Sequence, residues 1–324
     1  MQSSGLRQVD EALKKMAARL SATRLHSLMH EPERSQFIYQ FEDLTVDCTR
    51  QLLDEDGMNA LLHLAENCQL QTRIDEMFSG ALVNITEHKP AQHMAARTPD
   101  HLASVAYQKL STFANSVRRN PNITTVVNLG IGGSDLGPKM VTQALAGFHD
   151  GPVCHFVGNI CPTDLHDVLV TCDPHKTLFI VTSKTFTTTE TIANAMMAKH
   201  WLNRHGVDAG PAMVAVTAAE TRAQAWGIHP DHIFAFADGI GGRYSVWSSV
   251  GLSVMIAIGI ENFSRMSAGA YAMDRHVQHT ELAQNIGVIM GLLRVWYRRY
   301  LQLPAYGLIP YDQRLASLPA WAQQ

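Results

Sequence analysis

The sequence predicts a doubly wound α/β fold built on a parallel sheet of about five strands. From about residue 121 onwards, short apolar runs rich in β-branched residues alternate with longer segments of helical periodicity. Strands joined by helix-length connections imply right-handed crossovers, which place helices on both faces of a parallel sheet. At 324 residues and 46% hydrophobic content, the chain can bury a sizeable core. In such folds ligands bind at the carboxyl ends of the strands.

Five segments carry the strand pattern, at residues 125–129, 152–157, 177–182, 211–217 and 233–236. Before them the chain follows mainly helical periodicity, with Leu13, Met16 and Leu20 at helical spacing. After about residue 265 it becomes helical again. The most apolar stretch, residues 247–260, is shorter than the roughly 20 residues of a membrane span, so it predicts a buried core helix.

Composition favours a small-molecule partner. The formal net charge is -3 and neither sign forms a long run, which argues against nucleic acid and membrane surfaces as partners. The first residues lack the pattern of a secretory signal, and we expect a cytoplasmic protein. Five cysteines at irregular spacing include no Cys-x-x-Cys pair, and no His-Glu-x-x-His occurs. We therefore expect buried thiols, no metal site and no cofactor.

The first expected strand leads into a glycine-rich loop, residues 130–137. Glycines let backbone N–H groups approach an anion, and the start of the following helix adds a positive dipole. The loop is neither a dinucleotide fingerprint, because Asp135 replaces a required glycine, nor a Walker loop, because Pro138 replaces the lysine. Taken alone, it fits a tight strand-to-helix turn about equally well.

The third expected strand is followed by residues 183–191, which carry six hydroxyls and one ammonium. Thr187 and Glu190 have the spacing of a capping box, which explains part of this composition. Helix interiors disfavour threonine, whereas hydroxyls and N–H groups that converge at a helix start suit a phosphate monoester. We favour phosphate binding, with the lysine supplying charge.

After the fifth expected strand, two glycines precede Arg243. Its guanidinium is expected beside exposed backbone at the same sheet edge, and the alternative is a structural ion pair. A pocket built from the three loops would accept a phosphorylated, polyhydroxylated ligand better than a nucleotide.

Together the three loops resemble the glucose-6-phosphate isomerase family. The matching motifs are Gly130-Ile-Gly-Gly-Ser-Asp-Leu-Gly-Pro138, Ser183-Lys-Thr-Phe-Thr-Thr-x-Glu-Thr191 and Asp238-x-x-Gly-Gly-Arg-Tyr-Ser-x-Trp247, in the family's order and approximate spacing. Flanking matches, such as His93, Arg97 and the terminal Gln323-Gln324, extend the resemblance over nearly the whole chain.

The resemblance implies an aldose-ketose isomerase of glycolysis and gluconeogenesis that interconverts glucose 6-phosphate and fructose 6-phosphate. It assigns the sugar phosphate to Ser183, Lys184, Thr185, Thr188 and Thr191, and the lining of the same pocket to Gly133, Ser134 and Gln324. Arg243 would sit over the reacting carbons and stabilise the enediolate. The full-length family member would be a homodimer.

The resemblance also divides the chain into three domains. Residues 1–115 form a helical segment that packs on the second, larger subdomain, and residues 116–262 form the sugar-phosphate-binding α/β domain of sugar isomerase type. Residues 263–324 form the helical start of the second sugar isomerase domain, which is expected to be incomplete.

Several positions depart from the family. Ala237 and Gly239 stand where tryptophans are usual, Gly287 where proline is common and Lys89 where arginine is common. The family continues from Gln-Gln into Met-Glu-Ser-Asn-Gly-Lys, which bears the base glutamate, so this chain is expected to be inactive alone. The competing hypothesis is a non-catalytic sugar-phosphate-binding regulatory module, which needs no base.

Overall fold

The computed structural model describes residues 2–30 and 32–324, and the chain forms two compact units. The first unit comprises Met1–Val83 and Ala272–Gly307, and the second comprises Asn84–Tyr271 and Leu308–Gln324. Within the described residues, no helix combines the length and the apolar character that crossing a bilayer requires.

The second unit is built on a parallel five-stranded sheet with strand order β4-β3-β5-β6-β7. The strands are β3 (Thr125–Leu129), β4 (Val153–Val157), β5 (Thr177–Thr182), β6 (Met213–Val216) and β7 (Ile233–Phe234). Each lies inside one of the five expected segments, so the predicted sheet is confirmed. The central strand β5 is buried along its whole length, which explains why its residues 178–181 are a continuous apolar run instead of an alternating one.

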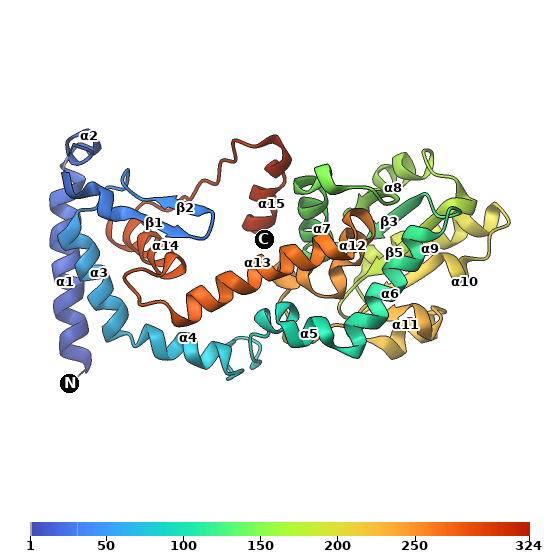
Figure 1. Cartoon of the computed structure of the whole chain (residues 1–324), viewed down its shortest axis with the longest axis horizontal. Coiled ribbons are helices and arrows are strands. Elements are labelled where there is room, and N and C mark those ends of the chain that lie inside the picture. The colour runs from blue at the N-terminus through green and yellow to red at the C-terminus, as the bar shows by residue number, and fades with distance from the viewer. Residues whose placement is uncertain (1, 31) are drawn as a thin grey trace. The chain divides into compact units, whose positions relative to one another are not determined.

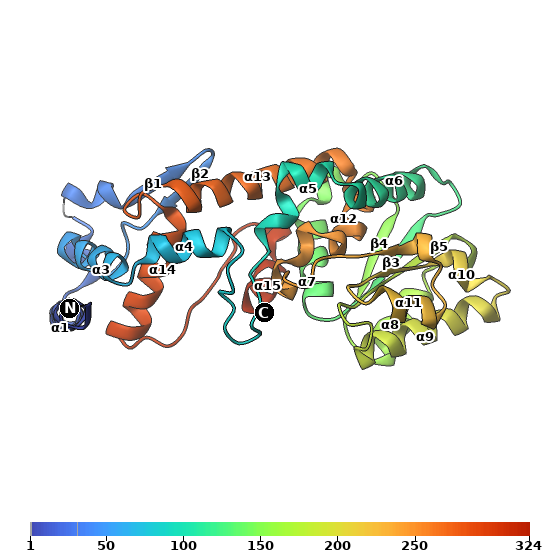
Figure 2. The same ribbon diagram turned by 90° about the horizontal axis from the view of Figure 1, so that it is seen from below.

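Helices cover both faces of this sheet, as expected for a doubly wound fold (Figure 2). Alternate strand residues point to opposite faces, so Val126 and Ile180 belong to one buried cluster while Val127 and Val181 belong to another. The first cluster packs against α6, α7 and α12, and the second against α8, α9, α10 and α11. In Figure 2 the strands lie between α6 on one side and α8, α9 and α11 on the other.

Helices α7 to α11 of this unit lie between successive strands, as expected for β-α-β crossovers, while α5 and α6 precede β3 and α12 and α15 follow β7. These helices are α5 (Pro99–Ala103), α6 (Val105–Arg119), α7 (Gly133–Ala144), α8 (Pro162–Leu169), α9 (Thr189–Arg204), α10 (Ala209–Ala212), α11 (Glu220–Trp226), α12 (Leu252–Ile258) and α15 (Leu318–Gln323). All residues of α12 are buried, which confirms the core helix predicted from the most apolar stretch. Helix α13 (Ile260–His279) begins in this unit and ends in the other.

The first unit is mainly helical. Its helices are α1 (Gln2–Ser21), α2 (Leu25–Leu28), α3 (Glu55–Asn67), α4 (Leu70–Phe78) and α14 (Ile286–Val295), followed by a π-helical turn at Trp296–Tyr300. Helices α1 and α3 run side by side (Figure 1). Trp296 is fully buried and its ring N–H donates to the carbonyl of Leu52 at 2.8 Å. This anchors the π-helical turn to the core of the unit.

An antiparallel hairpin in the first unit was not predicted. Its strands are β1 (Ile38–Phe41) and β2 (Leu44–Asp47), which pair from Ile38 opposite Asp47 to Phe41 opposite Leu44. Only Tyr39 of these eight residues is buried. Strands so short and so exposed leave little hydrophobic alternation in the sequence.

The two compact units do not coincide with the expected domains. The packing places residues 84–115 with the parallel sheet and residues 272–307 with the N-terminal helices. Compactness describes packing and not evolutionary domains, so the expected boundaries after residues 115 and 262 stay a prediction.

Candidate functional site

The three candidate loops open at one edge of the parallel sheet. Leu129 at the end of β3 pairs with Val181 in β5, and Thr182 at the end of β5 pairs with Val216 at the end of β6. Val216 in turn pairs with Phe234, the last residue of β7. Because the strands are parallel, the segments that follow them all begin at the carboxyl edge.

Glycines bring the first and third loops into direct contact. Gly132 precedes α7 with φ of +60°, and Gly133 is the first residue of the helix. A Cβ on Gly133 would lie 2.1 Å from the carbonyl oxygen of Gly242, so only glycine fits there. The Ser245 hydroxyl donates to the same carbonyl at 2.7 Å. The first loop therefore packs directly against the loop that carries Arg243.

A buried asparagine that sequence reasoning missed joins the first loop to the end of β5, directly before the second loop. Asn128 lies in β3 and is fully buried. Its side-chain amide donates to the carbonyl of Ser134 at 2.9 Å, and its oxygen accepts from the Thr182 hydroxyl at 3.2 Å. A polar residue inside an otherwise apolar strand was the signal that could have identified it.

The second loop differs from the expected capping box. Helix α9 begins at Thr189, its N-cap is Thr188, and no side chain caps it. The expected pairing of Thr187 with Glu190 is therefore wrong, because Thr187 lies outside the cap. The hydroxyl of Thr187 instead contacts that of Thr185 at 2.7 Å, so the threonines of this loop are not explained by capping.

Three of the loop's hydroxyls lie around the start of α9. Ser183 is buried directly after β5, and its hydroxyl lies 3.1 Å from that of Thr188. Thr191 is 1% exposed, and its hydroxyl has no hydrogen-bond partner among the described residues. A buried polar atom without a partner is rare in native proteins, and here it stands at the N-terminus of a 16-residue helix.

Lys184 links the second loop to the third. Its ammonium donates to the backbone carbonyl of Asp238 at 2.5 Å and lies 3.0 Å from the carboxylate of the same residue. Lys89 contacts the other carboxylate oxygen at 2.5 Å. The hydrogen bonds from Lys89 and then Lys184 lower the pKa of Asp238. Asp238 is therefore a carboxylate held between two lysines.

Arg243 is exposed on a short 3-10 helix, Gly242–Trp247. Among the residues described, it makes no ion pair, so the alternative of a structural ion pair is not supported. His93 lies beside this loop, where its ring accepts from the backbone N–H of Gly241 at 3.3 Å and stacks on Tyr244 at 4.2 Å.

Gln324 reaches the same place from the far end of the chain. Its side-chain nitrogen lies 3.1 Å from the position of a Cβ on Gly132 and 3.7 Å from that of a Cβ on Gly242. Helix α15 brings it there by packing on α7, where Trp321 lies against Gly137. The contacts thus join Gln324 to the first and third loops.

Asp135 is a second polar residue that the sequence interpretation left without a role. It lies in the first turn of α7 and is 6% exposed. Burial raises its pKa to about 6, with Lys139 lowering the pKa and Asp164 raising it. One carboxylate oxygen has no hydrogen-bond partner in the described part of the chain. This carboxyl is therefore easily protonated near the first loop.

The geometry offers anion recognition and a fixed positive charge. The start of α9 presents backbone N–H groups together with several hydroxyls, an arrangement that suits a phosphate monoester. Arg243 stands on the neighbouring loop. Over residues 2–30 and 32–324, no group of three or more His, Cys, Asp or Glu side chains could hold a metal ion.

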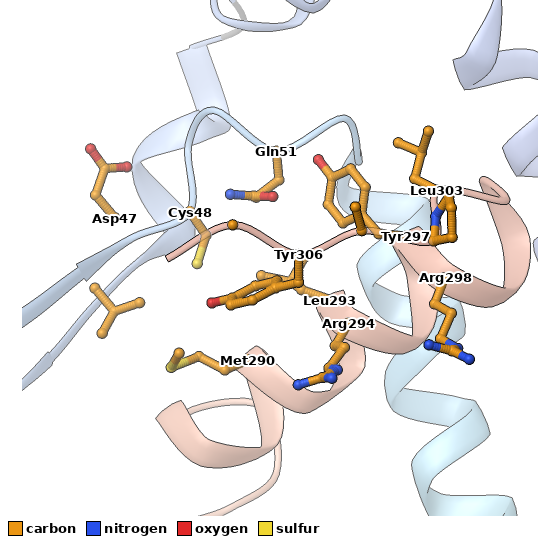
Figure 3. Close-up of a pocket in the computed structure, with 14 residues that line it drawn as sticks. Asp47, Cys48, Gln51, Met290, Leu293, Arg294, Tyr297, Arg298, Leu303 and Tyr306 are labelled. Carbon is orange, nitrogen blue, oxygen red and sulfur yellow. The ribbon is translucent and has the colours of Figure 1, made fainter. Parts of the chain in front are cut away.

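A cavity of about 370 Å³ in the first unit is lined by none of the expected site residues. Figure 3 shows its lining from the end of β2, from α14 and the π-helical turn, and from the segment around Tyr306. Cys48 lines it, but burial raises the pKa of this thiol and makes it a poor nucleophile.

A sequence model described as phosphoglucose isomerase matches residues 47–324. A protein of Xanthobacter autotrophicus named glucose-6-phosphate isomerase is 42% identical over 99% of this chain, and one of Roseobacter denitrificans with the same name is 39% identical over 97%. The chain spans 63% and 62% of the lengths of these two relatives.

Solved structures agree with this similarity. The crystal structure of a glucose-6-phosphate isomerase from Chlamydia trachomatis superposes with a TM-score of 0.86 at 28% sequence identity. The match covers 97% of this chain and 64% of the Chlamydia protein. The likeness thus extends over both compact units.

Proposed function

The chain belongs to the phosphoglucose isomerase family, and we propose that its three loops bind glucose 6-phosphate and fructose 6-phosphate for their interconversion. One observation carries the proposal. The hydroxyls of Ser183, Thr188 and Thr191 lie at the start of α9 without capping it, and that of Thr191 is buried with no partner among the described residues. A phosphate oxygen would supply the missing partner for this hydroxyl.

The phosphate is held by residues 183–191. Backbone N–H groups at the start of α9 and the side chains of Ser183, Thr185, Thr188 and Thr191 donate to its oxygens. The similarity to relatives named glucose-6-phosphate isomerase supports the choice of a sugar phosphate over other phosphate monoesters. Gly133 and Ser134 of the first loop, and Gln324 at the end of α15, then contact the sugar hydroxyls.

The isomerisation moves one carbon-bound proton from C2 to C1 of the open-chain sugar and one hydroxyl proton from O2 to O1. A base removes the C2 proton of the aldose to give an enediolate. Return of a proton to C1, with the hydroxyl proton passing from O2 to O1, gives the ketose, so the reaction needs no oxidant, reductant or cofactor. Arg243 stabilises the enediolate through its fixed positive charge, as preorganised electrostatic groups do. Its exposure and its freedom from ion pairs among the described residues leave the guanidinium available for this role.

Calorimetry on the polypeptide of residues 1–324 tests the proposal, because binding needs no general base. Thr191→Val removes only the unpartnered hydroxyl and is expected to weaken glucose 6-phosphate binding about tenfold or more. Thr142→Val is the matched control, because the Thr142 hydroxyl in α7 is also buried without a partner in the described chain. Equal effects of the two variants, or equal affinity for glucose and glucose 6-phosphate, would contradict the phosphate assignment.

Two further properties complete the proposal. The thiols of Cys48, Cys68, Cys154, Cys161 and Cys172 are free, which suits a reducing, cytoplasmic compartment.

The family resemblance supports a homodimer for the full-length protein, and light scattering at several concentrations would measure its oligomeric state. A monomer at all concentrations would contradict this part of the proposal.

A further inference from the structure

The carboxylate of Asp238 holds two lysines from separate segments of the second unit. Lys184 of the second loop lies 3.0 Å from one carboxylate oxygen, and Lys89 lies 2.5 Å from the other. Lys184 also donates to the backbone carbonyl of Asp238 at 2.5 Å. Two contacts to the same residue direct the Lys184 ammonium toward the third loop.

The segment that carries Lys89 is itself fastened to the third loop. The backbone groups of Asn84 and Lys89 exchange two hydrogen bonds, at 3.1 and 3.2 Å, which fix the position of Lys89. Further along, the N–H of Gln92 donates to the carbonyl of Gly239 at 3.0 Å. A Cβ on Gly239 would lie 2.4 Å from the Gln92 side-chain oxygen, so the two segments pack closely.

On its other side the third loop packs closely against the first loop, where Gly242 contacts Gly133. Arg243 follows directly after this contact. Because Asp238 contacts Lys184, a shift of Asp238 would change the position of residues 183–191 relative to the loop that carries Arg243.

We propose that Asp238 is a positioning residue that fixes the phosphate loop against the Arg243 loop through Lys184, with Lys89 holding its other oxygen. In this arrangement the phosphate is bound by hydroxyls and backbone N–H groups of residues 183–191, and Lys184 acts by setting the position of that loop. The inference rests on the proposed function and refines the role that the family resemblance gives to Lys184.

The competing possibility is that Lys184 contacts the phosphate directly, and it predicts the opposite change in affinity for one variant. If Lys184 contacted the phosphate directly, Asp238 would compete for its ammonium and repel the ligand, so Asp238→Asn would tighten binding. If Asp238 positions the loop, Asp238→Asn weakens binding. Lys184→Met weakens binding in both cases, so the test depends on Asp238.

The test is a double-mutant cycle, measured by calorimetry with inorganic phosphate and with glucose 6-phosphate. Asp238→Asn and Lys184→Met are each expected to weaken binding about threefold to tenfold, as for a partly exposed ion-pair network. The double variant is expected to bind no more weakly than whichever single variant has the lower affinity, because each substitution breaks the same contact between Lys184 and Asp238. Asp238→Glu keeps a carboxylate and is therefore expected to bind both ligands more tightly than Asp238→Asn does. Tighter binding by Asp238→Asn, or additive effects in the double variant, overturns the inference.

Hydrogen exchange of the ligand-free protein gives a second measurement that does not depend on ligand binding. Asp238→Asn and Lys184→Met are expected to speed exchange of the amides in residues 184–188, while Asp231→Asn, an exposed carboxylate before β7, leaves them unchanged. Unchanged exchange in the first two variants overturns the inference. If the unmodified chain binds neither ligand, the proposed function fails, whereas hydrogen exchange still decides the role of Asp238.

Discussion

Asp135→Asn is expected to stabilise the protein at pH 8 much more than at pH 4.5. The carboxyl is 6% exposed, and one of its oxygens lacks a hydrogen-bond partner among the described residues. Burial raises the pKa of Asp135 from 3.8 to about 6. The folded protein therefore binds this proton more tightly than the unfolded chain does, and stability falls as pH rises from about 4 to about 6.

The magnitude follows from the two pKa values. The difference between about 6 and 3.8 corresponds to about 3 kcal/mol of stability lost by pH 8, at about 1.4 kcal/mol per pKa unit. About 2 kcal/mol of this loss falls between pH 4.5 and pH 8. Asparagine cannot ionise, so the Asp135→Asn variant does not lose this stability as pH rises. Any fixed cost of packing the amide is the same at both pH values and cancels in the comparison.

Urea unfolding followed by tryptophan fluorescence measures the effect, because four of the five tryptophans lie in the second unit with Asp135. Asp167→Asn, at an exposed position on α8, serves as the control and should show no such pH dependence. A stability difference between Asp135→Asn and the unmodified chain that stays constant from pH 4.5 to pH 8 would refute the argument that this buried carboxyl ionises at a cost.

Two further variants test how the loops are held together. Gly133→Ala forces a methyl group against the carbonyl of Gly242, where a Cβ would lie 2.1 Å away, so we expect a loss of about 1–3 kcal/mol in urea unfolding and weaker glucose 6-phosphate binding. Asn128→Ala removes the partner of both Ser134 and Thr182. It should cost about 2–3 kcal/mol and speed hydrogen exchange in the first loop and at the end of β5, whereas unchanged exchange would show that the asparagine does not join them.

The parallel sheet was predictable because β3, β5, β6 and β7 are buried almost completely on both faces. In β5, where all six residues are buried, residues 178–181 form a continuous apolar run between Thr177 and Thr182. The hairpin of β1 and β2 was missed because seven of its eight residues lie partly or fully at the surface. Exposed strands are stabilised by pairing and local turns, and these leave little periodicity in the sequence.

The start of α9 could not be predicted from spacing alone. Thr187 and Glu190 have the spacing of a capping box, yet the helix begins at Thr189. Phe186 adopts a positive φ of 52° and is buried against Trp226. This backbone conformation is costly for a phenylalanine and persists because the surrounding packing holds it. Tertiary contacts therefore set where the helix starts.

The sequence by itself determined which segments form the sheet and which loops follow its strands, because burial and backbone conformation act on neighbouring residues. Only the tertiary structure decided which side chains from distant segments meet there. Lys184 and Asp238 are 54 residues apart, and Asn128 and Thr182 are also 54 apart. Contacts at such separations depend on how the strands pair and how closely glycines let the loops approach. No local pattern in the sequence records that geometry.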